Sequence, residues 1–249
     1  MKIQALFCDY DGTLAPLNVD RTRSRIPDRI AKALWRIRQS IPIAIVTAKD
    51  YSFIRVRTPF ADAWSCVYGF ETVTKEGVRK VGRLHSGFSD VARIAERMPN
   101  HPRIEVKTTS TGTVCGLCVE WNHEDAPDEE IMNANISDIR KSGLKVLYDP
   151  SYPMIDVLPA GHDKGVAVKG LKEMLGVEEG LMYVGDSLAD NPAFAQADAS
   201  IGVLGVRPQR HLDCDYLIDG KVLSRFLSAL LKNSLEFSKD LPGIRANGG

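Results

Sequence analysis

The stretch from Ile3 to Leu14, IQALFCDYDGTL, constrains most strongly what this chain can fold into. Its apolar run from Ile3 to Cys8 leads into a glycine turn, which predicts a short buried strand. Asp9 and Asp11 follow directly, at the strand end where open α/β sheets bind their ligands. Two carboxylates this close repel each other unless a cation or hydrogen-bond donors lie between them. The stretch therefore indicates a metal or catalytic site or, as the plainer interpretation, an ordinary polar turn.

The order of apolar runs predicts an α/β fold with a doubly wound parallel sheet. Short buried strands alternate with amphipathic helices in the first 71 residues, and the same alternation resumes after residue 158. This succession is typical of a parallel sheet with helices on both faces. The expected strands are 3–8, 42–46, 65–68, 181–184, 199–203 and 216–218, and the expected helices are 27–39, 50–57, 163–174, 188–195 and 221–233.

Residues 72–158 follow a different pattern, which predicts a small α+β domain inserted into the first. The connections between its strands are short, as in antiparallel sheets. The expected elements are a hairpin at 72–81, helices at 89–98 and from the acidic segment 124–130 to 142, and strands at 104–109, 113–121, 144–148 and 154–158. We therefore expect a Rossmann-like core of residues 1–71 and 159–235, an inserted domain of residues 72–158, and a flexible tail from 236 to 249.

The charge balance gives no sign of a nucleic-acid or membrane partner. The chain carries 32 basic and 32 acidic residues, so no overall field attracts polyanions. Arginines gather between residues 21 and 38, where they form either a solvated face or a phosphate-attracting rim. The sequence contains no signal segment and no run of about 18 apolar residues. We expect a cytoplasmic protein, monomeric or dimeric, whose partner is a small molecule.

The five cysteines do not form a recognisable framework. Their odd number argues against a disulfide-stapled secreted protein. Cys115 and Cys118 have the C-x-x-C spacing, but they lie within a predicted strand, where residues three apart point to opposite faces. No second pair completes a zinc site. We therefore expect structural thiols, with a metal or redox role for Cys115 and Cys118 as the alternative.

Polar side chains lie at four strand ends or helix starts of the predicted core: Asp9 and Asp11, Thr47, Lys164, and Asp186 and Asp190. In this order they resemble the four motifs of the haloacid dehalogenase superfamily of phosphohydrolases. Asp9 to Leu14 matches its D-x-D-G-T-L signature, and Gly185 to Asp190 matches its acidic fourth motif. The four motifs span residues 9 to 190, so the resemblance covers most of the chain. Each later motif is weak alone, whereas the ordered set is specific.

The resemblance implies catalytic residues for phosphoryl transfer. Asp9 is the expected nucleophile, which forms an aspartyl-phosphate. Asp11 is the expected acid and base, which protonates the leaving alcohol and then activates water. Thr47 and Lys164 are expected to bind the phosphoryl oxygens and stabilise their charge. Each residue also has a structural interpretation: Thr47 as the cap of the next helix, and Lys164 as a surface residue.

The resemblance also implies a Mg²⁺ site. Its expected ligands are the Asp9 carboxylate, the Asp11 backbone carbonyl, Asp186 and water, an oxygen-rich shell of the kind that Mg²⁺ prefers. Asp190 is expected to hold a metal-bound water or to orient Lys164. The structural alternative for Asp190 is a helix-terminal acid that supports the helix dipole.

The inserted domain corresponds to the cap that selects the substrate in this superfamily. Several stretches are similar to trehalose-phosphate phosphatases: Asp9 to Pro16, Gly69 to Glu71, Ile104 to Lys107, and Pro159 to Gly165. The E-x-K strand of that family lies near the sugar, which makes Glu105 and Lys107 the expected substrate contacts. Their structural alternative is the exposed face of a half-buried sheet.

Other stretches depart from the trehalose-phosphate pattern. The fourth motif reads GDSLADN, which is more similar to sucrose-phosphate, mannosyl-3-phosphoglycerate or phosphoglycolate phosphatases. Lys49 occupies a position where Arg is common in the second motif. The expected function is Mg²⁺-dependent hydrolysis of a sugar phosphate resembling trehalose 6-phosphate, or of one of these other metabolites. The further alternatives are a phosphomannomutase-like phosphomutase and a non-catalytic binding or regulatory protein that keeps the fold.

Overall fold

The structure of the 249-residue chain is a computed structural model, which describes all residues except 18, 84–102, 122–128, 149–153, 206–210 and 249. The predicted helix at 89–98, the acidic segment up to residue 128, and the turn between the last two strands of the insert lie outside the described residues. The chain divides into two compact units, and each is described by itself. One unit contains Met1–Lys80 and Asp163–Gly249, and the other contains Val81–His162.

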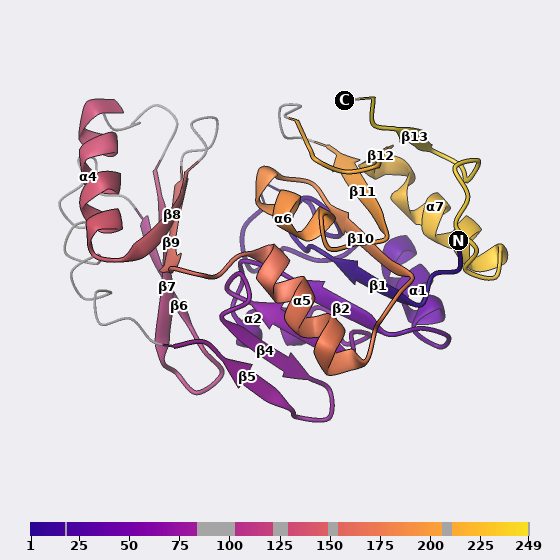
Figure 1. Ribbon diagram of the computed structural model, residues 1–249, viewed down its shortest axis with the longest axis horizontal. Coiled ribbons are helices and arrows are strands. Elements are labelled where there is room, and N and C mark those ends of the chain that lie inside the picture. The colour runs from indigo at the N-terminus through magenta and orange to yellow at the C-terminus, as the bar shows by residue number, and fades with distance from the viewer. Residues whose placement is uncertain (18, 84–102, 122–128, 149–153, 206–210, 249) are drawn as a thin grey trace. The chain divides into compact units, whose positions relative to one another are not determined.

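The first unit is built on a nine-stranded sheet with the order β13-β12-β11-β10-β1-β2-β3-β4-β5 (Figure 1). The strands from β12 to β3 pair in parallel, and antiparallel pairs lie outside them, β12 with β13 and β3 with β4. This mostly parallel sheet confirms the predicted fold class. Its strands are β1 (Ala5–Cys8), β2 (Ile43–Val46), β3 (Ala63–Cys66), β4 (Glu71–Thr74), β5 (Arg79–Val81), β10 (Leu181–Gly185), β11 (Ala199–Leu204), β12 (Tyr216–Asp219) and β13 (Ile244–Ala246).

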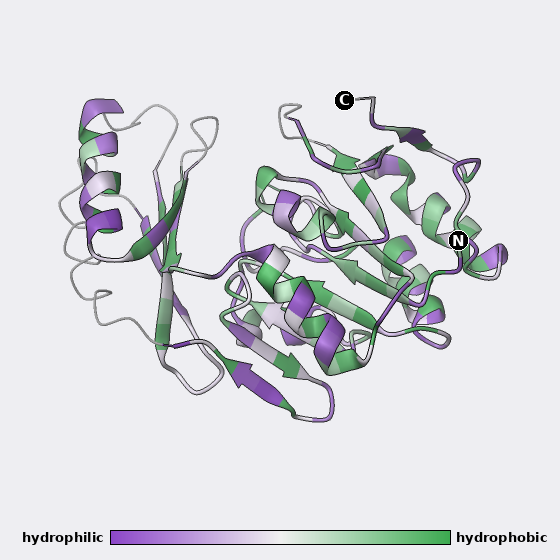
Figure 2. Cartoon of the chain, in the orientation of Figure 1, coloured by the Kyte–Doolittle hydropathy of each residue, from purple (hydrophilic) through white to green (hydrophobic). Residues whose placement is uncertain are grey.

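Helices cover the sheet because the central strands are apolar along their whole length (Figure 2). Such strands must be buried on both faces. Helices α5 and α6 pack with Phe7, Val46 and Tyr183 in one core cluster, while α1 and α7 pack against each other. The helices are α1 (Asp28–Ile37), α2 (Tyr51–Arg55), α5 (Lys164–Leu175), α6 (Asn191–Phe194) and α7 (Leu223–Lys232), with short 3-10 turns at Leu188–Asp190 and Gly220–Val222.

The strand order reverses at β1. The chain passes from β1 to β2 on one side, and it later returns to β10 on the other side. Open α/β sheets bind ligands at the carboxyl ends of the strands beside such a reversal. The residues that follow β1 and β10 are Asp9 and Asp186, so the topology brings the first and fourth motifs together.

Two segments differ from the sequence-based expectation. The hairpin at 72–81, expected in the insert, joins the main sheet, because β4 pairs with β3 through Ser65–Thr72 and neighbouring residues. The tail, expected to be flexible from residue 236, contains β13, which pairs with β12. The Phe237 ring anchors the start of the tail by packing against Tyr216 and Phe226. Pairing with β13 also covers β12, which would otherwise be an open sheet edge.

The second unit has a four-stranded antiparallel sheet with the order β6-β7-β9-β8. Helix α4 packs on one face of it, where Met132, Ile136 and Ile139 meet the apolar side chains of the strands. This separate antiparallel sheet agrees with the predicted α+β insert. The elements are β6 (Arg103–Thr108), β7 (Val114–Glu120), α4 (Glu129–Lys141), β8 (Leu144–Tyr148) and β9 (Met154–Pro159).

All five cysteines are free thiols with buried side chains. Burial raises the pKa of Cys8 and of Cys214, which keeps both thiols protonated at neutral pH. We therefore predict that a water-soluble aromatic disulfide reagent modifies no thiol rapidly in the native protein and all five after unfolding in guanidinium. The coloured thiolate that the reagent releases measures the number of modified thiols in the native and in the unfolded protein. A thiol that reacts within seconds in the native protein would contradict this burial.

Candidate active site

Asp9 lies at the carboxyl end of β1, where the residue is only 5% exposed. Its carboxylate oxygen Oδ1 is 2.9 Å from the Lys164 ammonium Nζ. Burial raises the pKa of Asp9 well above its ordinary value, and the neighbouring carboxylates Asp190 and Asp186 add to the rise, while Lys164 opposes it. A further cation bound beside Asp9 would favour its ionised form.

Lys164 is the first residue of α5, and Asp163 caps that helix by accepting a hydrogen bond from the Val166 amide. A cation at a helix start is electrostatically unfavourable. Lys164 is nevertheless buried, with Nζ 2.7 Å from Asp190 Oδ1 as well as close to Asp9. Burial alone would lower its pKa, but the charges of Asp190 and Asp9 outweigh burial and raise it. The two carboxylates thus keep Lys164 as a buried cation.

Both oxygens of the Asp190 carboxylate accept several hydrogen bonds. Oδ1 accepts hydrogen bonds from Lys164 Nζ and from the Tyr183 hydroxyl, each at 2.7 Å. Oδ2 accepts from the Ser187 hydroxyl at 2.8 Å and from two backbone amides. Burial tends to raise the pKa of Asp190, but Lys164 and these hydrogen bonds lower it overall. Asp190 is therefore a buried carboxylate that forms an ion pair with Lys164.

Two glycines make room for these acids. A Cβ on Gly185 would lie 2.4 Å from Asp190 Cγ, so only glycine at the end of β10 leaves room for this carboxylate. A Cβ on Gly12 would lie 2.1 Å from Asp186 Oδ2, and the φ angle of Gly12 is +83°. The left-handed backbone and the close approach both favour glycine at residue 12.

Among the described residues, one cluster has the spacing of a metal site: Asp9, Asp186 and Asp190, whose ligand atoms lie within 4.8 Å of one another. Asp186 is 8% exposed and accepts a hydrogen bond from Thr13 Oγ1 at 3.0 Å. These hard carboxylate oxygens suit a small divalent cation such as Mg²⁺. The donors around Asp190 leave Asp9 and Asp186 as the better candidates for direct ligands.

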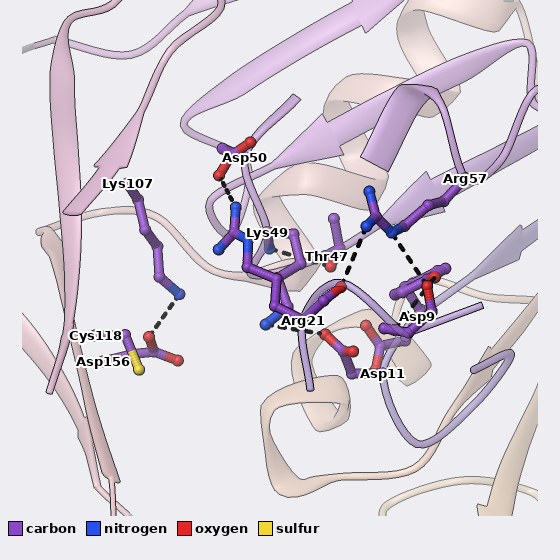
Figure 3. Close-up of polar contacts among 12 residues, drawn as sticks. Asp9, Asp11, Arg21, Thr47, Lys49, Asp50, Arg57, Lys107, Cys118 and Asp156 are labelled. Carbon is purple, nitrogen blue, oxygen red and sulfur yellow. Dashed lines mark hydrogen bonds and ion pairs between the residues drawn. The ribbon is translucent and has the colours of Figure 1, made fainter. Parts of the chain in front are cut away.

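Asp11 and Thr47 lie on the loops that follow β1 and β2. Asp11 is partly exposed, with Oδ2 3.5 Å from Lys49 Nζ. The Thr47 side chain is 1% exposed, and its hydroxyl accepts a hydrogen bond from the Lys49 amide at 3.2 Å. Thr47 is not the cap of the next helix, because Asp50 fills that role by accepting from the Phe53 amide. Figure 3 shows Thr47, Lys49 and Asp50 among these polar contacts.

The two predicted residues of the insert lie on β6. Glu105 is half-buried and pairs across the sheet with Cys118. Lys107 is 4% exposed, with Nζ 2.7 Å from Asp156 Oδ1 on β9 (Figure 3). Lys107 therefore lies in a buried ion pair, and the expectation of a solvent-exposed sheet face does not fit this residue.

Sequence reasoning missed several polar neighbours of the predicted residues. Asp156 occupies one place in an otherwise apolar strand, MIDVLP, and this interruption was the available signal. The Tyr183 hydroxyl bonds Asp190, but the strand LMYVG gives no hint of a polar role for its tyrosine. Lys49 was noted as a departure from the second motif, while its ion pair with Asp11 depends on how two loops meet in space.

Comparison with known proteins shows the type of fold. No protein-family model matches the chain. A "HAD Subclass IIB Sugar Phosphatase", BT4131, superposes with a TM-score of 0.66 at 17% identity over 94% of this chain and all of that one. The C-terminal domain of C. albicans trehalose-6-phosphate phosphatase superposes with a TM-score of 0.70 at 17% identity over 93% of each chain. The chain has the haloacid dehalogenase-like fold of subclass IIB sugar phosphatases.

Curated relatives agree with this class. A probable trehalose-phosphate phosphatase of Oryza sativa is 25% identical over 96% of this chain and 72% of its own length. An uncharacterized glycosyl hydrolase of Mycobacterium tuberculosis is 25% identical over 91% of the chain, which spans only 18% of that protein. These relatives and structures include trehalose-phosphate and sugar phosphatases, which agrees with the haloacid dehalogenase resemblance recognised in the sequence. No described helix is both long enough and apolar enough to cross a membrane.

Proposed function

We propose that the protein is a Mg²⁺-dependent phosphomonoesterase that works through an aspartyl-phosphate on Asp9. The observation that carries this proposal is the buried cluster at the ends of β1 and β10. There Lys164 contacts both Asp9 and Asp190, and the Asp186 carboxylate lies within metal-binding reach of Asp9. A carboxylate nucleophile, a fixed cation and a divalent site are the parts that phosphoryl transfer to an enzyme needs.

Each residue of the cluster has a role in this reaction. Asp9 attacks phosphorus, and the bond from phosphorus to the ester oxygen breaks. Lys164 and the Thr47 hydroxyl bind the equatorial oxygens, where negative charge gathers in the transition state. Asp9, Asp186 and the Asp11 carbonyl would hold Mg²⁺, which supplies charge neutralisation when bound. Asp190 holds the Lys164 ammonium in place.

Asp11 has the position of an acid and base. It follows Asp9 by two residues on the same loop, and its carboxylate is more exposed than that of Asp9. A partly exposed carboxyl group can give a proton to the leaving alkoxide and later take one from the water that hydrolyses the aspartyl-phosphate. The products are an alcohol, inorganic phosphate and the regenerated Asp9 carboxylate.

For the substrate we propose a sugar phosphate similar to trehalose 6-phosphate. The support comes from the relatives and structures named above. Glu105 and Lys107 are the proposed substrate contacts of the second unit, and Asp156 is the partner that holds the Lys107 ammonium at 2.7 Å. The GDSLADN motif makes sucrose 6-phosphate, mannosyl-3-phosphoglycerate and phosphoglycolate the substrates to compare.

We predict that the purified protein releases phosphate from p-nitrophenyl phosphate in the presence of Mg²⁺. Removal of the metal with EDTA is expected to lower the rate by at least about a hundredfold, because the charge neutralisation by the cation contributes several kcal/mol. Excess Mg²⁺ should restore the rate. A panel of the four metabolites named above then identifies the preferred ester by kcat/KM. No release from any of these esters would contradict the phosphatase proposal, and equally poor turnover of the four metabolites would contradict the sugar-phosphate class.

A further inference from the structure

Arg57 joins two loops that carry proposed catalytic residues. It follows α2, which begins shortly after Thr47, and its guanidinium reaches the segment after Asp11. Arg57 Nη2 donates to the Arg21 carbonyl at 3.2 Å (Figure 3). Its Nε donates to the Ser24 carbonyl at 3.1 Å. Arg57 Nη1 donates to the Phe53 carbonyl at 3.0 Å. One planar group thus holds three carbonyls from two parts of the chain.

The Phe53 ring strengthens this connection. The Arg57 guanidinium carbon lies 3.8 Å from the ring centroid, and that of Arg21 lies 4.5 Å from it. Arg21 also pairs with Asp50, the cap of α2, at 2.5 Å. Stacking of arginine on a phenylalanine ring adds cation–π attraction to the hydrogen bonds. We name the group of Arg21, Ser24, Phe53 and Arg57 the arginine clamp.

The arginine clamp contacts the catalytic loop through Tyr10. Tyr10 lies between Asp9 and Asp11, and its side chain is fully buried. Its hydroxyl donates to the Ser24 carbonyl at 3.1 Å and accepts from the Ser24 hydroxyl at 3.3 Å. Its ring meets Phe53 edge to face, with 6.0 Å between centroids. Any displacement of Ser24 or Phe53 would therefore be transmitted to the backbone that carries Asp11.

We propose that Arg57 is a positioning residue for Asp11, a role that rests on the phosphatase function proposed above. Arg57 contacts none of the reacting groups in that proposal. It fixes Ser24 and Phe53, these hold Tyr10, and Tyr10 sets the loop from which Asp11 protonates the leaving group. A lysine cannot replace it, because an ammonium lacks the planar fork that reaches three carbonyls and stacks on the ring.

The test compares two esters of similar shape whose leaving groups differ in acidity. Phenolate needs a proton to leave, whereas p-nitrophenolate is a good leaving group without one, so loss of a positioned acid slows phenyl phosphate selectively. For Arg57→Lys and Arg57→Ala we expect kcat/KM for phenyl phosphate to fall at least about tenfold, and that for p-nitrophenyl phosphate to change by less than about threefold. The value of kcat/KM reports transfer to Asp9 and excludes the later hydrolysis.

Arg55→Ala is the matched control. Arg55 is the last residue of α2, two residues before Arg57, it is exposed, and its guanidinium carbon is 5.8 Å from the Tyr51 ring centroid. It is expected to keep both kcat/KM values, because it does not take part in the arginine clamp. Far-ultraviolet circular dichroism and thermal unfolding check the fold. If Arg57→Ala does not fold, Arg57→Lys carries the test, since it keeps the charge and most of the volume.

The outcomes separate this role from the function on which it rests. An inactive wild-type protein would overturn the phosphatase proposal and this inference with it. An active wild-type protein whose Arg57→Lys variant slows both esters equally, or neither, would overturn the role of Arg57 alone. Selective slowing of phenyl phosphate in a folded Arg57→Lys variant, with Arg55→Ala unchanged, is the result expected from the arginine clamp.

Discussion

Replacement of Asp9 by asparagine is expected to remove Mg²⁺-dependent phosphatase activity while leaving the protein folded. The amide keeps the shape of the carboxylate but is not a nucleophile towards phosphorus, so kcat should fall at least about a thousandfold. The fold should survive because Lys164 keeps its second partner, Asp190, at 2.7 Å. Substitution also removes one of several crowded carboxylates, and burial together with repulsion from Asp190 and Asp186 raises the pKa of Asp9. Steady-state phosphate release and circular dichroism measure the two effects.

Asp28→Asn is the control for Asp9→Asn. Asp28 is exposed in the first turn of α1, and the same chemical change there should leave kcat unaltered. Brief incubation with substrate and rapid acid quenching should trap phosphate on the wild-type protein and not on Asp9→Asn. Full activity in Asp9→Asn, or equal trapping on both proteins, would show that another residue is the nucleophile.

Replacement of Asp190 by alanine is expected to be the most destabilising single change at this site. The variant leaves the buried Lys164 without its closest carboxylate, and Tyr183 and Ser187 lose their acceptor. Removing one partner of a buried ion pair costs about 3 to 5 kcal/mol. For a chain of this length, that loss lowers the thermal midpoint by about 6 to 20 °C. Urea unfolding followed by circular dichroism measures the free energy directly.

Two further variants refine the Asp190 prediction. Asp190→Asn keeps one oxygen for Lys164 and Tyr183, but its amide NH₂ faces the Ser187 donors, so we expect a loss of about 1 to 3 kcal/mol. Asp213→Ala removes an exposed carboxylate that pairs with His211, and its effect should stay below about 1 kcal/mol. An unchanged urea midpoint for Asp190→Ala would mean that Lys164 does not depend on this ion pair.

Much of the fold could be predicted from the sequence because the local signals agree with one another. The apolar run before Asp9, the proline before α1 and the Gly176 stop after α5 each act within a few residues of themselves. The alternation of strands and helices then selects a parallel sheet. The ordered motifs from Asp9 to Asp190 allowed the superfamily to be recognised. These patterns do not depend on which residues meet across the fold.

The sequence was less informative where pairing partners are distant along the chain. The hairpin after β3 has the turn signals of any hairpin, and whether it extends the main sheet depends on its pairing with β3. The tail became part of the sheet through Phe237, whose contacts with Tyr216 and Phe226 come from other elements. The composition of the tail predicts flexibility, because composition does not show that a single aromatic residue packs against other elements.

The division between sequence and tertiary structure is clearest at the site itself. The sequence alone determined the resemblance to the superfamily, the parallel sheet and the acids at the strand ends, since each of these follows from residue types and short spacings. Only the tertiary structure decided that Asp190 pairs with Lys164, that Lys107 pairs with Asp156, and that Tyr10 bonds Ser24 of the arginine clamp. Hydrogen bonds and ion pairs act over about 3 Å, and the partners in these contacts lie 14 to 49 residues apart in the chain. Spacing along the sequence does not predict these contacts, because they form only where the folded sheet brings distant loops together.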